Sequence, residues 1–154
     1  MLRAFRDLLN DILPSDTAAP PGEPSLRLAA AVLLMEVMRA DGGGIGADER
    51  HAAAVALQEQ FGLADGEWEP LLRQAEQESR TAYDYFRFTN PLDQQLAQPA
   101  KVDFIEAMWR VALADDQLGV AENSVIRQVA ELLHVTHGEY IAAKLHAREA
   151  QGAA

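Results

Sequence analysis

The sequence predicts an all-α protein of about seven helices, and three observations lead to this fold class. Apolar residues recur at helical spacing almost throughout residues 25–150. No stretch alternates between apolar and polar residues for long enough to indicate a strand. The apolar content of 49% in a chain of 154 residues is enough for the core of one domain. We therefore expect one helical domain over residues 25–150.

A separate helix is expected before this domain, over residues 1–13. Its apolar side chains fall on one face, as in an amphipathic helix: Leu2, Phe5, Leu9 and Ile12. Residues 14–24 contain four prolines and one glycine, a composition typical of a linker. The helix either docks onto the domain, binds a partner protein, or associates weakly with a membrane surface through residues 2–12.

Caps, glycines and prolines set the expected helix ends within the domain. Ser25 is the N-cap of the first helix, Gly62 stops the second, and Asp65 caps the third. Asn90-Pro91 opens a short helix after an aromatic-rich turn, because proline favours the first helical position. The expected helices cover roughly residues 25–39, 47–61, 65–81, 91 onward, 99–114, 120–133 and 136–150.

Two parts of the chain are similar to each other at an offset of about 72–74 residues. Residues 38–41 (Met-Arg-Ala-Asp) correspond to residues 112–115 (Ala-Leu-Ala-Asp), and a glutamate follows each after a short loop. Further along, residues 61–68 correspond to residues 133–140, and both contain Gly-Glu before an aromatic residue. Two halves are too few for an open solenoid, so we expect them to pack around one core.

Each half carries an acidic loop, in which an aspartate after one helix precedes a glutamate in the first turn of the next. The helix dipole stabilises such a glutamate by about 0.3–1 kcal/mol and disfavours an anion at a helix C-terminus. Loop N–H groups, the N-terminus of the next helix or a divalent cation (calcium, magnesium or zinc) compensates the aspartates. An EF-hand is excluded, because the positions of its first and third ligands hold no carboxylate. The candidate metal ligands are Asp41, Glu49, Asp115 and Glu122, with Asp48 and Asp116 as supplementary acids.

Charge and cysteine content exclude several functional classes. The chain has 24 acidic and 13 basic residues, whereas nucleic-acid binding depends on Lys and Arg that release counterions. It has no cysteine, which excludes disulfides, thiolate nucleophiles and Cys-ligated clusters. The longest apolar run, residues 28–35, is shorter than the ~20 residues of a membrane-spanning helix. We expect a cytoplasmic protein with no integral membrane segment and no nucleic-acid partner.

An aromatic cluster between residues 83 and 88 is a further candidate feature. It consists of Tyr83, Tyr85, Phe86, Arg87 and Phe88. These side chains either plug the space between the two halves or form an exposed patch for a partner protein, since aromatic residues and arginine dominate interface hot spots. The sequence leaves both alternatives open.

Residues 38–42 followed by Glu49, residues 114–115 followed by Glu122, and residues 84–89 (Asp-Tyr-Phe-Arg-Phe-Thr) resemble the TerB-like family. This is the tellurite-resistance protein B superfamily, and the chain is most similar to its short stand-alone members over residues 26–148. The resemblance implies an all-α domain in two related halves and a role in stress response. It also implies metal binding through Asp41, Glu49, Asp115 and Glu122, but no established reaction.

The expected function is that of a non-enzymatic, tellurite-resistance-like domain that binds a protein partner and a divalent cation. The sequence contains no nucleophile–base pair and no cofactor motif, so we assign no catalytic residue. The alternative is a metal-assisted hydrolase that activates water with the paired carboxylates of the two loops. That alternative requires the four carboxylates to converge on one concave site.

Overall fold

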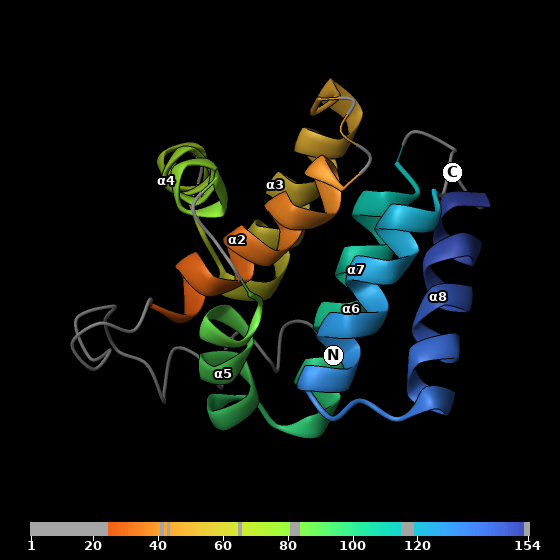
Figure 1. Ribbon diagram of the computed structural model, residues 1–154. Helices are drawn as coiled ribbons and strands as arrows, with labels where there is room; N and C mark the ends of the chain where they lie inside the picture. Colours follow the sequence, from red (N-terminus) through yellow and green to blue (C-terminus); the bar gives the residue numbers. More distant parts are fainter. Residues whose placement is uncertain are drawn as a thin grey trace.

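The structure is a computed structural model that describes residues 25–40, 42, 44–64, 66–80, 84–114 and 119–152. These residues form seven helices and no strand (Figure 1), which confirms the expected all-α fold. The helices are α2 (Leu26–Arg39), α3 (Ala47–Phe61), α4 (Trp68–Arg80), α5 (Phe86–Gln95), α6 (Gln98–Ala112), α7 (Val120–Leu132) and α8 (His137–Gly152). The expected helix over residues 1–13 and the linker over residues 14–24 lie outside the described residues.

Helix α2 is the centre of the fold. Eleven of its 14 residues are buried, and it packs against α3, α4, α5, α6 and α7. Figure 1 shows α2 between α4 on one side and the adjacent helices α6, α7 and α8 on the other. Ser25 caps its start as expected, because the Ser25 hydroxyl oxygen accepts a hydrogen bond from the Leu28 N–H at 3.2 Å. Each fully buried leucine contributes about 1.5–3 kcal/mol to the free energy of folding, so α2 supplies a large part of the stabilisation by the core.

Helices α3 and α7 end in the same way. Gly62 follows α3 with φ of 65°, and His134 follows α7 with φ of 61°. The Gly62 N–H donates to the Gln58 carbonyl at 3.0 Å, which closes the last turn of α3. After α7, the N–H of Val135 donates to the Ala130 carbonyl at 2.9 Å, the long bond of a Schellman motif. The expected stop at Gly62 is confirmed, whereas the left-handed histidine was not anticipated.

Helix α5 begins at Phe86, so the prediction that Asn90-Pro91 opens a helix was wrong. The N–H groups of Phe88 and Thr89 already donate to the Tyr85 carbonyl, at 3.0 and 2.8 Å. Pro91 therefore lies inside the helix, where its ring is buried. The packing of that ring offsets the loss of one helical hydrogen bond, and α5 ends four residues later.

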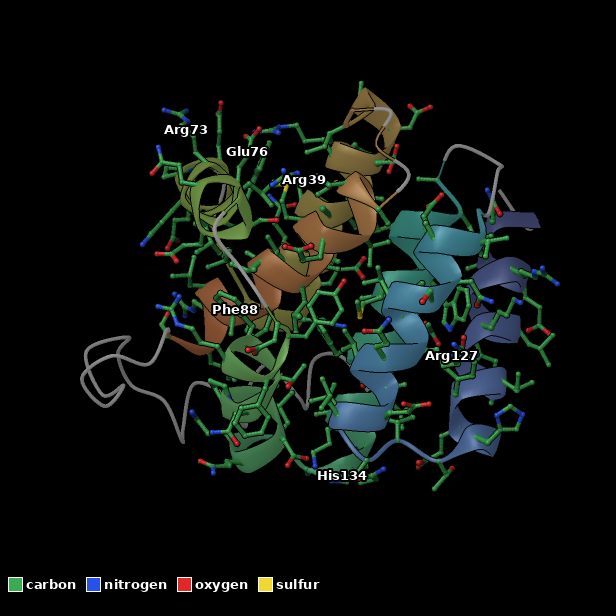
Figure 2. All side chains as sticks on the ribbon, viewed as in Figure 1. Arg39, Arg73, Glu76, Phe88, Arg127 and His134 are labelled. Carbon is green, nitrogen blue, oxygen red and sulfur yellow. The ribbon has the colours of Figure 1, made fainter. Side chains whose placement is uncertain are left out.

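Polar contacts tie α4 to the central helix. The Ser79 hydroxyl on α4 donates a hydrogen bond to the Glu36 carboxylate on α2 at 2.6 Å. The same hydroxyl oxygen accepts a hydrogen bond from the Arg39 guanidinium at 3.2 Å, and Figure 2 shows Arg39 between the two helices. Ser79 is buried, so both bonds are formed away from solvent, where leaving a polar group unpaired costs about 1–3 kcal/mol.

A second polar link joins α5, α6 and the turn between α7 and α8. The Lys101 ammonium donates to the Asp93 carboxylate at 2.6 Å, and His134 Nδ1 lies 3.0 Å from the same oxygen. Figure 2 shows His134 at the lower end of α7. Burial raises the pKa of Asp93, but the hydrogen bonds from Lys101 and His134 outweigh burial and lower it. The side chains of Lys101 and Asp93 are only 11% and 23% exposed. Removing one partner would therefore leave a poorly solvated charge.

Candidate functional site

Glu49 and Glu122 each fold back over the start of their own helix. Both are the third residue of a helix, α3 and α7, and both are buried, with exposed fractions of 6% and 3%. The Glu122 carboxylate accepts a hydrogen bond from the Gly119 N–H at 3.3 Å. The Glu49 carboxylate lies over Gly46, where an added methyl group would meet its Oε1 atom at 3.4 Å. A glutamate in this position satisfies the first N–H groups of the helix and complements its dipole.

A second pair of glutamates forms the same contact at the next helix starts. The Glu67 carboxylate accepts from the Ala64 N–H at 2.9 Å, and the Glu139 carboxylate accepts from the Thr136 N–H at 2.9 Å. The Thr136 hydroxyl completes a capping box by accepting from the Glu139 N–H at 3.2 Å. A glutamate three residues after a helix cap is a sequence signal that indicates this contact.

The remaining predicted metal ligands fall on different parts of the chain. Asp41, Asp115 and Asp116 lie outside the described residues. Asp48 is exposed in the first turn of α3. Within the described ranges, no group of three or more His, Asp or Glu side chains is arranged to hold a metal ion. The two described glutamates of this set, Glu49 and Glu122, therefore lie at the starts of α3 and α7, with their carboxylates over Gly46 and Gly119.

The aromatic cluster is divided between the core and the surface. Phe88 is buried, and Tyr85 is half-buried and packs against the core. Burial, and then the nearby Glu36 carboxylate, raise the pKa of Tyr85. Phe86 is 60% exposed, and the exposed Arg87 guanidinium stacks over the Phe88 ring at 5.2 Å. Helix α5 packs against both α2 and α7, and Figure 2 shows Phe88 on the α5 side that faces α2.

Neither alternative for the aromatic cluster holds as a whole. Phe88 is a core residue of α5, a helix that packs against both α2 and α7, whereas Phe86 and Arg87 are exposed at the surface. Arg87 also forms an exposed ion pair with Glu78 of α4 at 3.4 Å. The fifth member, Tyr83, lies outside the described residues.

A groove of about 920 Å³ runs over α6 between α3 and α8. Helix α6 packs against both of these helices and forms the floor, while α3 and α8 form the walls. Half of the lining residues are apolar and most of these are small, among them Ala52, Val55 and Ala56 on α3, Val102 and Ala107 on α6, and Ala147 on α8. Side chains of this size leave the space above α6 open. We refer to this feature as the α3–α6–α8 groove.

This groove was not predicted from the sequence. Alanines and valines at helical spacing, as on α3, are typical of a packed core, and the sequence does not show which of them remain uncovered. The only available signal was the small size of these residues, which permits close packing as readily as an open groove.

Charged side chains line the rim of the groove. On α6, Arg110 forms ion pairs with Glu106 at 2.6 Å and with Glu59 of α3 at 3.9 Å. His146 Nδ1 on α8 lies 3.3 Å from the other Glu106 oxygen. Burial, and then the Glu106 charge, raise the pKa of the half-buried Asp103. One arginine, Arg110, pairs with two carboxylates, so this group of three side chains keeps a net negative charge. A further cation would therefore be attracted to this rim.

The comparison with protein families matches residues 27–145 to a family described as tellurite resistance protein TerB. The matched range runs from the start of α2 into α8, and therefore covers most of the chain. Neither the comparison with curated proteins nor that with solved structures gave a match. Among the helices that the structure describes, none is both long and apolar enough to cross a membrane.

Proposed function

This chain belongs to the tellurite resistance protein TerB family, and on that premise we propose that it is a non-enzymatic module that binds a partner protein. The docking surface is the α3–α6–α8 groove. The bound segment of the partner is an amphipathic helix with basic residues beside its apolar face. In keeping with the family, the module acts in a stress response of the tellurite-resistance type.

The shape of the groove is the observation that carries this proposal. The apolar half of the lining is a strip of mostly small side chains from three helices, and polar or charged side chains form the other half. Such a strip suits the apolar face of a helix, which inserts side chains at positions i, i+3 or i+4, and i+7.

Charge selects the kind of helix. The acidic side chains Glu59, Asp103 and Glu106 line the groove beside a single arginine, Arg110. That arginine is held by ion pairs with Glu59 and Glu106. Lysine or arginine at the flank of the incoming helix would meet acidic partners there, which favours association and selects against acidic helices.

A designed peptide tests the docking surface. The probe is a fluorescent 14-residue helix with leucine at positions 2, 5, 9 and 12 and lysine at positions 3 and 6. We expect the protein to bind it, and Val102→Glu in the groove floor to weaken binding at least tenfold, about 1.4 kcal/mol. Gln128→Glu, which adds the same charge at an exposed position of α7, is the matched control. Fluorescence anisotropy measures both affinities.

Two results would overturn the proposal. One is equal binding of a scrambled peptide of the same composition, which would show that charge alone drives association. The other is equal weakening by Val102→Glu and Gln128→Glu, which would place the binding surface outside the groove. Ala52→Glu, on the α3 wall, repeats the test at a second half-buried position in case Val102→Glu unfolds the protein.

Divalent-cation binding at the two acidic loops is the second part of the proposal. It is supported by the matching placement of Glu49 and Glu122, whose buried carboxylates stand at the helix starts that follow these loops. Calorimetric titration with calcium, magnesium and zinc tests it, with Asp41→Asn/Asp115→Asn as the comparison. Heat of binding that is present for the wild type and absent for the double variant is the expected result. Identical titrations would reject the site.

A metal-assisted hydrolase has less support. It requires carboxylates of both loops around metal ions about 3.5–4 Å apart. Glu122 instead accepts the N–H of Gly119, the N-cap of its own helix, and neither Glu49 nor Glu122 lines the groove. Magnesium-dependent hydrolysis of bis(p-nitrophenyl) phosphate that disappears in Asp41→Asn/Asp115→Asn would favour the hydrolase over the binding module.

A further inference from the structure

The N-terminal segment of this chain has the features that the α3–α6–α8 groove selects. Its apolar residues Leu2, Phe5, Leu9 and Ile12 stand at positions i, i+3, i+7 and i+10. These are the anchor spacings of a helix that lies in an apolar groove. We propose that residues 2–12 occupy the α3–α6–α8 groove of the same chain, and that a partner helix binds by displacing them. This inference rests on the docking surface proposed above.

The linker is long enough for this placement. Residues 13–24 separate the segment from Ser25, the first described residue. At about 3.1 Å per residue, an extended proline-rich stretch of this length spans about 37 Å. A folded unit of about 130 residues has a radius of gyration near 14 Å, so its diameter is similar to that span. The segment can therefore reach a large part of the domain surface from Ser25.

The segment also fits the length of the groove. As a helix, residues 2–12 extend about 16 Å, at 1.5 Å per residue. The lining residues of α6 run from Gln98 to Arg110, which is about 18 Å along the helix axis. All four apolar anchors can thus lie over the groove floor at once.

Charge favours one orientation of the segment. With about 100° between successive residues, Arg6 stands at the edge of the apolar face, whereas Asp7 and Asp11 stand on the opposite side. In the groove, Arg6 would lie toward the acidic rim that includes Asp103 and Glu106, and both aspartates would face solvent. The two sides are therefore complementary in charge as well as in polarity.

The covalent connection makes even weak docking effective. A tether of about a dozen residues gives a local concentration on the order of 1 mM. If the free segment binds with a Kd of about 100 μM, the attached segment fills the groove about ten times out of eleven. A competing helix then binds about tenfold more weakly than to an empty groove, because only the open fraction is competent.

Disulfide trapping tests the occupant directly, because the chain has no cysteine of its own. In Leu9→Cys/Val102→Cys, mild oxidation should produce a disulfide within one chain, seen as a faster-migrating monomer on a non-reducing gel. The matched control Asp11→Cys/Val102→Cys places the thiol on the opposite side of the segment. The control Leu9→Cys/Gln128→Cys moves the second thiol to an exposed position on α7.

The three cysteine pairs give distinct results. Cross-linking of Leu9→Cys/Val102→Cys at least fivefold faster than both controls supports the proposal. Equal rates in all three overturn it, since they would reflect a segment that contacts the surface at random. Disulfide-linked dimers in place of monomers also overturn it, because the segment would then come from a second copy of the chain.

Peptide competition separates this inference from the proposed function. Phe5→Asp removes the largest anchor of the segment, so we expect it to bind the designed leucine–lysine peptide about tenfold more tightly than the wild type does. Equal, measurable affinity of both proteins overturns the inference and leaves the docking surface intact. Failure of both proteins to bind the peptide overturns the docking surface and the inference with it.

Discussion

The capping role of Glu122 leads to a quantitative prediction. Its carboxylate is buried, is the third residue of α7 and accepts the Gly119 N–H at 3.3 Å. Loss of a helix cap costs typically about 1 kcal/mol, and loss of a charge at the positive end of the helix costs about 0.3–1 kcal/mol more. We expect Glu122→Ala to lower the free energy of unfolding by about 2 kcal/mol. For a domain of about 130 residues, this corresponds to a decrease in Tm of about 7 °C.

Thermal unfolding followed by circular dichroism at 222 nm measures this change. The matched control is Glu131→Ala, which removes an exposed glutamate from the same helix and should shift the free energy of unfolding by less than about 0.5 kcal/mol. Glu122→Gln keeps an acceptor oxygen but not the charge, so its Tm should lie between those of the wild type and Glu122→Ala.

Two outcomes would refute the reasoning. If Glu122→Ala melts within about 2 °C of Glu131→Ala, the contact with Gly119 does not stabilise the helix start. If calcium, magnesium or zinc raises the Tm of the wild type by the amount that Glu122→Ala loses, and leaves the variant unchanged, the carboxylate stabilises the fold through a cation.

Three other predictions concern stability. Asp93→Asn should lower the free energy of unfolding by about 3 kcal/mol in urea, because the buried Lys101 ammonium loses its carboxylate. The folded-state pKa of Asp93 lies below the usual 3.8, so its stabilising contribution is complete above about pH 4 and is lost as the pH falls through the folded-state pKa. Acid unfolding of Asp93→Asn should therefore be less steep in that range. Gly62→Ala should cost about 1 kcal/mol, because φ is 65° there, whereas Gly138→Ala inside α8 should stabilise by up to about 1 kcal/mol.

Two results would contradict these predictions. Parallel acid-unfolding curves for the wild type and Asp93→Asn would show that the ion pair does not contribute to the loss of stability at low pH. A Tm for Gly62→Ala at or above that of Gly138→Ala would show that the left-handed stop of α3 is not under conformational constraint.

Local signals in the sequence were sufficient for most of the fold. Ser25 is an N-cap with its hydroxyl bonded as predicted, and Gly62 has the left-handed conformation that a helix stop requires. Both depend on residues within one turn of each other, so tertiary packing does not alter them. The start of α5 was not predictable in the same way. Burial of the Pro91 ring makes a proline tolerable inside a helix, and burial is a property of the assembled core.

The candidate site was likewise predictable only where it depends on neighbouring residues in the sequence. The glutamates of the two acidic loops were predicted as helix-dipole residues, and the structure adds the glycine N–H that Glu122 accepts. The groove was not predictable, because its existence depends on α3 and α8 packing on α6 at a distance from each other. A sequence specifies which residues are small and apolar, but only the tertiary arrangement decides which of them remain accessible.

The central position of α2 has a consequence for the order of events at the ribosome. This helix is among the first parts of the domain to be synthesised, yet it is covered by helices that end as late as Leu132. At about 5–20 residues per second, the last of its neighbours emerges roughly 5–20 s after α2. During that interval an almost entirely apolar helix is exposed on the nascent chain. Newly made chains should therefore depend on chaperone binding more than their small size suggests.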